Sequence, residues 1–498
     1  MDILRDVLFV LFATLACSWG WGMRGTTIGG EKGAMLPGAL LGLSIAVFSA
    51  SDVLYENFFL LSGMGAVAMY CGGNMTYGET FRFSMESRPA PNMKKGMLAL
   101  FVKGGIWFGV FSAVIGLYIS FLSGLYYSLF DIIALFLLIP SFSLLGYYIF
   151  NKPYNKEKGT FPRVYFSVTR KETWGGLLGI LCAFVAVAAV NLDVFTLIVA
   201  TAGVLSGGIG WMIAQFMQVS VKYENRRGKF LFDRLRRKGF IESWKLMECT
   251  LGAFGGLGVS LCIVLCKSMF VTRLDAIEAG GLFSFVSQDV STAMAAAFAL
   301  LLTLDTALYF IKSRPTKAEL DRKLELTLIS HEDYERELPF ATGEDTNPLV
   351  TKIRAAAEKA EFGLYSTLPM MLMLLGSTQT AALVSFCVIL LVEAQEQCFK
   401  NYKFFKKLYL WKIVLLGGAL AAAILQFVAG AVPNLPVTML LYTVVYEALE
   451  LIEVRWRNIH PVGNGARLKM PPCAKGVHGY FITCCAVLLV ITAIIVVA

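Results

Sequence analysis

Apolar runs of about 20 residues recur from one end of this sequence to the other. An α-helix rises 1.5 Å per residue, so a run of this length crosses the roughly 30 Å hydrocarbon core of a bilayer. We count about fourteen such runs, the first near residues 6–22 and the last near 478–497. The sequence therefore predicts an all-α, polytopic bundle of about fourteen transmembrane helices.

The composition leaves little room for a soluble domain. Of the 498 residues, 57% are hydrophobic, and the mean hydropathy is +0.65. The longest polar stretch, residues 316–360, has fewer than about 50 residues, which is too few to bury a sizeable core. We expect it to be a partly helical cytoplasmic insert rather than an enzymatic domain.

The net charge of +9 is concentrated in alternate loops. Basic residues gather in 82–95, 152–171, 222–245, 312–354, 400–407 and 455–475, whereas the intervening short loops hold almost none. This positive-inside pattern predicts a multi-pass protein of the cell inner (plasma) membrane, with cytoplasmic basic loops and the N-terminus outside. The run 222–240 is also suited to lying on anionic lipid. The placement argues against a nucleic-acid partner.

Cysteine and histidine spacing predicts no metal site, and the sequence suggests no cofactor. The chain has eleven cysteines, most of them within apolar runs, and three histidines. No CxxC pair or zinc-type spacing occurs, so the thiols are expected to act as small hydrophobic residues. No nucleophile or metalloprotease signature occurs either, and no catalytic residue is assigned.

The sequence predicts a four-helix unit that is repeated along the chain. In each copy the first helix opens on a glutamate and the third on a lysine: Glu31, Glu172 and Glu361, then Lys103, Lys245 and Lys412. Because each unit has an even number of helices, the copies would share one orientation around an axis along the membrane normal. The third copy matches least. The alternative is that Gly-rich helices and basic loops give any polytopic protein some self-similarity.

These observations predict six segments along the chain. They are residues 1–30 (first helix and Gly-rich loop), 31–153 (first unit), 171–315 (second unit), 316–360 (insert), 361–457 (weaker third unit) and 458–498 (loop and last helix).

The segment 24–38 is the most unusual in the chain, with several glycines beside Arg24, Glu31 and Lys32. Glycines let backbone N–H groups converge, and a helix N-terminus adds partial positive charge. Such a loop can bind an anionic or hydroxyl-rich group. The alternative is a turn in which a broken helix packs closely against its neighbours.

Polar clusters end the second helix of each unit. They are Asn74, Thr76, Tyr77 and Glu79, then Trp211, Gln215 and Gln218, then Glu393, Gln395, Glu396 and Gln397. If the units surround an axis, these clusters converge into a ring that suits a polyhydroxylated or zwitterionic solute. The alternative is that they are interfacial caps that touch headgroups and water.

Several charged residues lie within or at the ends of the apolar runs. Snorkelling to the interface is the default interpretation of the lysines that open the third helices. Lys245 can also pair with Glu248 at i+3. Asp305 and Glu447 lie deeper, where acids commonly carry protons or ions in transporters. Together, Lys245, Glu248, Asp305 and Glu447 suggest proton or cation coupling, with local pairing as the alternative.

The predicted function is a transporter or facilitator of a small polar solute, with a site between the repeats and the lipid bilayer as its surroundings. One alternative is a membrane transferase that acts on an inner-leaflet substrate through Arg24, Glu31, Lys32, Asn74 and Glu79. The other is a membrane scaffold. The sequence leaves the substrate and the oligomeric state open.

Overall fold

The structure is a computed structural model of the chain. It describes residues 2–24, 32–73, 75, 80, 92–123, 126–155, 158–166, 172–222, 232–238, 240–274, 286–313, 317–325, 362–376, 380–385, 434–459 and 475–497, with single residues or pairs between 331 and 338, at 387–388 and between 417 and 429.

Six helices in the described part are long and apolar enough to cross a membrane. They are α1 (Asp2–Met23), α6 (Met93–Leu122), α7 (Leu129–Phe150), α9 (Val194–Lys222), α11 (Ser243–Leu265) and α13 (Gln288–Ser313). Side chains cap several of them. Asn92 caps α6, Glu242 caps α11, and Ser128 forms a capping box with Asp131 at α7.

Six further helices have shorter apolar stretches. They are α2 (Met35–Phe48, preceded by the 3₁₀ turn η1, Lys32–Ala34), α4 (Phe58–Gly73), α8 (Trp174–Val190), α17 (Thr367–Leu375), α20 (Leu435–Ile459) and α21 (Lys475–Val497). The six long and six shorter helices coincide with twelve of the expected apolar runs. The other two, near 379–397 and 408–429, fall mostly outside the described residues, so fourteen spans stay a prediction.

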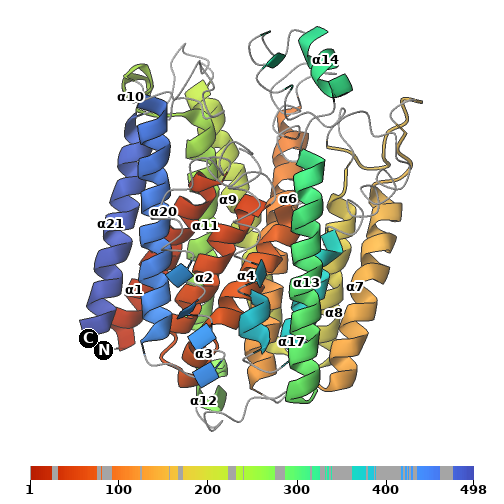
Figure 1. The fold of residues 1–498 in the computed structure, drawn as a ribbon, viewed down its shortest axis with the longest axis vertical. Helices are drawn as coiled ribbons and strands as arrows, with labels where there is room; N and C mark the ends of the chain where they lie inside the picture. The colour runs from red at the N-terminus through yellow and green to blue at the C-terminus, as the bar shows by residue number, and fades with distance from the viewer. Residues whose placement is uncertain are drawn as a thin grey trace.

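Short elements join the helices at the ends of the bundle. They are α3 (Asp52–Glu56), α10 (Asp233–Arg237), η2 (Lys267–Met269), α12 (Val271–Leu274) and α14 (Lys317–Glu325). Both termini lie at one end, near α3, whereas α10 and α14 lie at the opposite end (Figure 1). The described parts of two basic segments therefore share one end of the bundle. Which side of a membrane this end faces stays a prediction.

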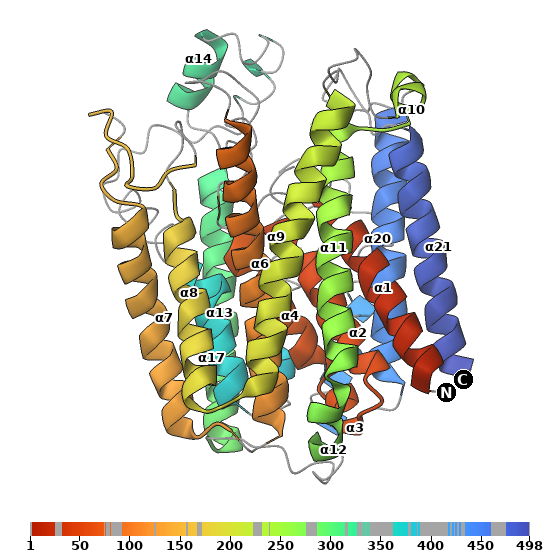
Figure 2. The ribbon, with the colours of Figure 1, turned by 180° about the vertical axis from the view of Figure 1, so that it is seen from behind.

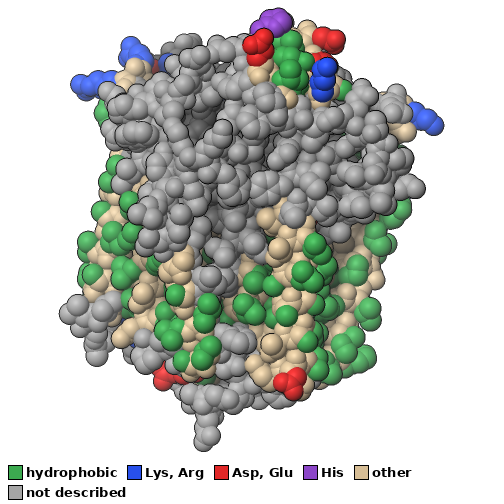
Figure 3. All heavy atoms as spheres, in the orientation of Figure 1, with side chains coloured by type: hydrophobic (Ala, Val, Ile, Leu, Met, Phe, Trp, Pro, Cys, Tyr) green, Lys and Arg blue, Asp and Glu red, His purple; other side chains and the backbone are tan. Residues whose placement is uncertain are grey.

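The described surface separates apolar flanks from charged ends. Hydrophobic side chains cover the sides of the helices, and the charged side chains visible in Figure 3 gather at the two ends. The apolar stretch of α6, by contrast, is entirely buried, and α6 lies between α4, α8 and α9 (Figure 2). This distribution indicates a membrane-embedded helical protein.

Four antiparallel helix pairs share one packing device. In each pair, two glycines four residues apart face two carbonyl oxygens that are also four residues apart. The pairs are Gly38 and Gly42 of α2 against Gly65 and Leu61 of α4, Gly175 and Gly179 of α8 against Gly146 and Phe142 of α7, Gly203 and Gly207 of α9 against Phe108 and Gly104 of α6, and Gly252 and Gly256 of α11 against Cys17 and Ala13 of α1. A Cβ at any of these eight glycines would come within 2.6 Å of the facing oxygen. Small residues at this spacing bring helix backbones together in membranes.

The pairing differs between the first two expected units. The first helix of unit one, α2, packs on the helix that follows it, whereas the first helix of unit two, α8, packs mainly on the preceding α7. The N-terminal α1, expected outside the units, lies against α2 and α11. The internal repeat is therefore not confirmed and stays a prediction.

Candidate functional site

Three helices, α1, α2 and α4, each have one end in the interior of the bundle instead of at its surface. With 14 and 16 residues, α2 and α4 extend only about 21 and 24 Å, short of the roughly 30 Å core of a bilayer. The last turn of α4 reaches Trp107, which lies halfway along α6, and Trp107 Nε1 donates to the Met69 carbonyl at 2.8 Å. The last turn of α1 reaches the same place, because the Trp21 and Trp107 rings are 4.6 Å apart. The first turn of α2 lies beside it, since a Cβ at Gly20 would be 3.0 Å from the Cα of Pro37.

Arg24, just after α1, lies between two of these aromatic rings. Its guanidinium carbon is 5.4 Å from the centre of the Trp21 ring and 5.2 Å from that of Trp107, and the residue is 5% exposed. Cation–π contact at this distance stabilises a desolvated guanidinium. Trp107 also lies 5.7 Å from Trp211 of α9. The aromatic rings therefore join α1, α6 and α9 around one buried cation.

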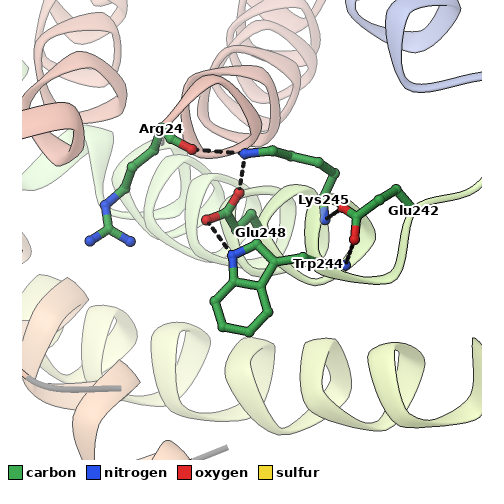
Figure 4. Close-up of polar contacts among 5 residues, drawn as sticks. All are labelled: Arg24, Glu242, Trp244, Lys245 and Glu248. Atoms are coloured by element: carbon green, nitrogen blue, oxygen red, sulfur yellow. Dashed lines mark hydrogen bonds and ion pairs between the residues drawn. The ribbon is translucent and has the colours of Figure 1, made fainter. Parts of the chain in front are cut away.

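A buried ion pair on α11 connects to the end of α1. Lys245 Nζ lies 2.6 Å from Glu248 Oε2 and donates to the Arg24 carbonyl at 2.8 Å, while Trp244 Nε1 donates to Glu248 Oε1 (Figure 4). The Arg24 guanidinium points away from this pair. Lysine is well placed here because the carbonyls that end a helix carry partial negative charge.

A second buried ion pair lies one helical turn from Trp107. Lys103 Nζ is 3.1 Å from Glu172 Oε2 and donates to Thr80 Oγ1 at 2.7 Å, and the side chains of Lys103 and Glu172 are 0% exposed. Glu172 also accepts from the Phe166 backbone N–H at 3.1 Å. Residues 103 and 107 share a face of α6, so this pair joins the same interior region.

A further branch runs from α4 to α13. Tyr70 follows Met69 and lies 5.8 Å from the Tyr365 ring, and the Tyr365 hydroxyl donates to Asp305 Oδ2 at 2.7 Å. The ammonium group of Lys32, in η1, lies 5.0 Å from the centre of the Tyr365 ring. Asp305 is 9% exposed, so this acid, its tyrosine and the nearby cation are all shielded.

We call these connected groups the central polar network. It comprises Trp21, Arg24, Lys32, Tyr70, Lys103, Trp107, Glu172, Trp211, Lys245, Glu248, Asp305 and Tyr365. It joins α1, η1, α4, α6, α9, α11 and α13 in the interior. Burying charges in an apolar bundle is costly, so such groups are normally paired and mark functional sites.

The inner face of α9 extends the network with amides. Trp211, Gln215 and Gln218 follow at spacings of four and three residues, and each is 1% exposed. Within the described part of the chain, the Oε1 of Gln218 and the Nε1 of Trp21 are buried without a hydrogen-bond partner. The amide oxygen of Gln218 can therefore accept a hydrogen bond from a polar ligand, and the indole N–H of Trp21 can donate one.

The described part of the chain brings six of the predicted residues together: Arg24, Lys32, Trp211, Lys245, Glu248 and Asp305. Gln215 and Gln218 lie beside them on α9. Glu31, Asn74, Thr76, Tyr77, Glu79, Glu393, Gln395, Glu396 and Gln397 lie outside the described residues, as do Glu361 and Lys412. Glu447 belongs to α20, but its side-chain surroundings are not described. No group of three metal-ligating side chains occurs among the described residues.

Snorkelling was the wrong expectation for Lys103, and at Lys245 the predicted alternative, pairing with Glu248, is the one observed. The side chains of both are buried, at 0% and 7% exposure, and both are ion-paired. Helix α6 begins at Met93, which places Lys103 almost three turns inside it, and the end of α1 covers Lys245. The interfacial-cap alternative likewise does not apply to Trp211 and Gln215, each 1% exposed.

Sequence reasoning missed the aromatic members Trp21, Trp107 and Tyr365 and the pairing of Lys103 with Glu172. The sequence contained a signal for Trp107: it follows Lys103 by four residues, and residues at i and i+4 share a helix face. A lysine of interest therefore predicts a neighbouring tryptophan on the same face. No family model matches this sequence, and no curated protein or solved structure matches it either.

Proposed function

We propose that the protein transports a small polar solute, which binds where the ends of α1, α2 and α4 meet beside Trp107. The observation that carries the proposal is the meeting of these three helix ends halfway along α6, next to the buried cation Arg24. Helices interrupted in the middle of a membrane bundle expose backbone groups that can bind a solute, and they are typical of secondary transporters.

The residues available to the solute suit a zwitterionic or hydroxyl-rich molecule. Arg24 and Lys32 can attract a carboxylate or another electron-rich group, whereas Trp21, Trp107 and Trp211 offer flat apolar faces. Gln218 adds a buried acceptor on the neighbouring face of α9. We also infer that the undescribed Glu31, Asn74, Tyr77 and Glu79 complete this site.

Coupling to a proton or cation is assigned to the acids of the network. Asp305 lies in α13 and is held by Tyr365, so a change in its protonation would alter contacts that lead to Lys32 and Tyr70. Glu248, held by Lys245 and Trp244, connects in the same way to the end of α1. We also propose that the protein has about fourteen transmembrane helices and an N-terminus on the outer side of the membrane.

The test is a thermal-shift screen of the purified protein against sugars, amino acids, nucleosides, anions and cations, followed by uptake of each hit into proteoliposomes. Ligand at 100 times its Kd should stabilise the protein by about 2.7 kcal/mol. Arg24→Gln should abolish the stabilisation and the uptake, and Arg24→Lys should restore part of both.

Lys267→Met is the matched control, because Lys267, in η2, pairs with Asp6 near the start of α1, at the opposite end of that helix from Arg24. Like Arg24→Gln, it removes one positive charge, and in addition it breaks an ion pair. Hits whose stabilisation and uptake are unchanged in Arg24→Gln would overturn the proposed site. Solutes that bind but never enter proteoliposomes would overturn transport in favour of the transferase or the scaffold.

A further inference from the structure

A cavity of ≈ 400 Å³ is lined by residues of α1, α11 and α21. The first turns of α11, which line it, lie at the end of the bundle that carries α10, as the ribbon in Figure 2 shows. The walls of the cavity are mainly apolar and include Leu246, Ala253 and Phe254 of α11. The hydroxyls of Ser18 and Tyr480, which also line it, are 2.6 Å apart and hydrogen-bond to each other. The cavity therefore offers mostly hydrocarbon contact to an occupant.

The cavity belongs to the lipid-facing side of the bundle. On α11, Leu257 is 40% exposed and Leu261 44% exposed, and on α21 Ile482 is 49% exposed. Large apolar side chains on the outer surface of an apolar bundle face acyl chains rather than water. An acyl chain can therefore reach this cavity from the surrounding leaflet.

A basic segment lies directly before the cavity in the chain. Residues 233–238 hold four basic side chains and one acid, Asp233, which pairs with Arg236 and Arg237. Arg234, Arg237 and Lys238 are exposed. We call these three residues the basic cap.

Exposed apolar side chains accompany the basic cap. Phe232, Leu235 and Phe240 are 45%, 43% and 44% exposed. Basic and apolar side chains exposed together are typical of a segment at the level of lipid headgroups.

The basic cap and the cavity are physically continuous. The Phe240 backbone N–H donates to the Leu235 carbonyl at 2.9 Å, which holds the rim of the cavity against α10. Phe240 and Ile241 then line the cavity itself. Glu242, also at the rim, accepts hydrogen bonds from the Trp244 and Lys245 backbone N–H groups as the cap of α11, which offsets its charge.

We propose that this is a binding site for one anionic phospholipid of the adjoining leaflet. An acyl chain occupies the cavity between α1, α11 and α21, and the phosphate group lies on the basic cap. Charge complementarity selects the anionic headgroup, and the apolar walls select a lipid over a free anion. The cavity shares Lys245 with the central polar network, but the proposed lipid site does not depend on the transport hypothesis.

Native mass spectrometry of the full-length protein in detergent tests the site directly. The probes are phosphatidylglycerol and phosphatidylcholine with identical acyl chains, added separately at equal concentration. We expect higher occupancy by phosphatidylglycerol, on the order of fivefold for each basic residue that contacts the headgroup. Equal occupancy by the two lipids would overturn the proposal.

Two sets of variants separate the headgroup from the acyl chain. The triple variant Arg234→Gln/Lys238→Gln/Arg237→Gln should bring phosphatidylglycerol occupancy down to that of phosphatidylcholine. Its matched control, Lys94→Gln/Lys158→Gln/Lys317→Gln, removes three exposed charges elsewhere and should keep the preference. A loss of the preference in the control as large as in the triple variant would show non-specific attraction and overturn the site.

Filling the cavity tests the position of the acyl chain. Ala253→Phe should lower the occupancy of both lipids, and Ala253→Leu, a milder change that tests the cavity if the larger one prevents folding, should lower it less. Inorganic phosphate at equal concentration should not displace phosphatidylglycerol. Unchanged lipid occupancy in a folded Ala253→Phe protein, or full displacement by phosphate, would overturn the proposal.

Discussion

Lys103 Nζ lies 3.1 Å from Glu172 Oε2, although the two residues are 69 positions apart in the chain. The sequence pattern placed the lysine at the start of the third helix of the first expected unit and the glutamate at the start of the first helix of the second. Two sequence marks from different positions of the expected repeat, one in each unit, thus meet as ion-pair partners. Whatever the origin of the repeat, this contact fixes one expected unit against the next.

Removing one partner of this pair should destabilise the protein strongly. Glu172→Gln leaves the buried Lys103 charge without its acid, which costs about 3–5 kcal/mol in comparable pairs. The double variant Lys103→Met/Glu172→Leu should recover much of the loss, because neither charge is then buried. Unfolding by SDS in mixed micelles measures both. A double variant as unstable as Glu172→Gln would show that the unpaired Lys103 charge is not the cause of the instability.

Glycine substitution should discriminate close packing from open surface. Gly207→Ala places a Cβ against the Gly104 carbonyl and Phe108 and should cost about 1–3 kcal/mol through overpacking. A Cβ at Gly479, in α21, would meet no heavy atom within 4 Å, so Gly479→Ala should stabilise by about 0.5–1 kcal/mol. The same SDS unfolding titration measures the stability of both variants. Equal changes in stability for Gly207→Ala and Gly479→Ala would refute the glycine-mediated contact between α6 and α9.

Tyr127, between α6 and α7, should make stability depend on alkaline pH. Burial raises the pKa of its hydroxyl, and the Asp193 carboxylate, 2.6 Å away, raises that pKa further. A raised pKa adds stability that is complete below the unfolded value of about 10 and is lost as the pH rises above it.

Tyr127→Phe should therefore cost about 1.5–3 kcal/mol at neutral pH and flatten the alkaline part of the stability curve. Tyr148→Phe, at an exposed tyrosine, is the control. Thermal unfolding between pH 7 and about pH 11 would reveal the difference. If the stability of Tyr127→Phe falls with rising pH in parallel with that of the wild type, Tyr127 is not the cause of the alkaline loss of stability.

Asp305→Asn should uncouple transport without preventing solute binding. The amide keeps a hydrogen-bonding group for Tyr365 but cannot release a proton. Uptake driven by a pH gradient should be lost in proteoliposomes, whereas exchange of labelled for unlabelled solute should continue. If gradient-driven uptake survives in Asp305→Asn, the coupling role belongs to another residue.

The helices could be predicted from the sequence because hydropathy is a local property, and twelve expected runs coincide with apolar helices. Their partners could not be, because pairs such as Gly252 with Cys17 or Lys103 with Glu172 connect distant parts of the chain. The snorkelling prediction failed for a related reason. It placed lysines by their distance from a predicted helix end, whereas burial depends on which neighbouring helix covers them.

Five of the predicted charged residues, Arg24, Lys32, Lys245, Glu248 and Asp305, lie inside the bundle, but the aromatic rings beside them were missed. Trp107 is one of many aromatic residues in an apolar chain, and the helix ends that reach it, those of α1 and α4, come from distant parts of the sequence. Arg24 was predicted as part of a Gly-rich loop. Its place between two tryptophan rings depends on how α1 and α6 pack.

The glycine contacts also limit how the bundle can change shape. Where two backbones touch at glycines four residues apart, sliding one helix along its partner would bring a larger side chain against a carbonyl and force the helices apart. Sliding within the couples α1–α11, α2–α4, α6–α9 and α7–α8 is therefore disfavoured. The central polar network joins different couples, as at the contact between Trp21 of α1 and Trp107 of α6.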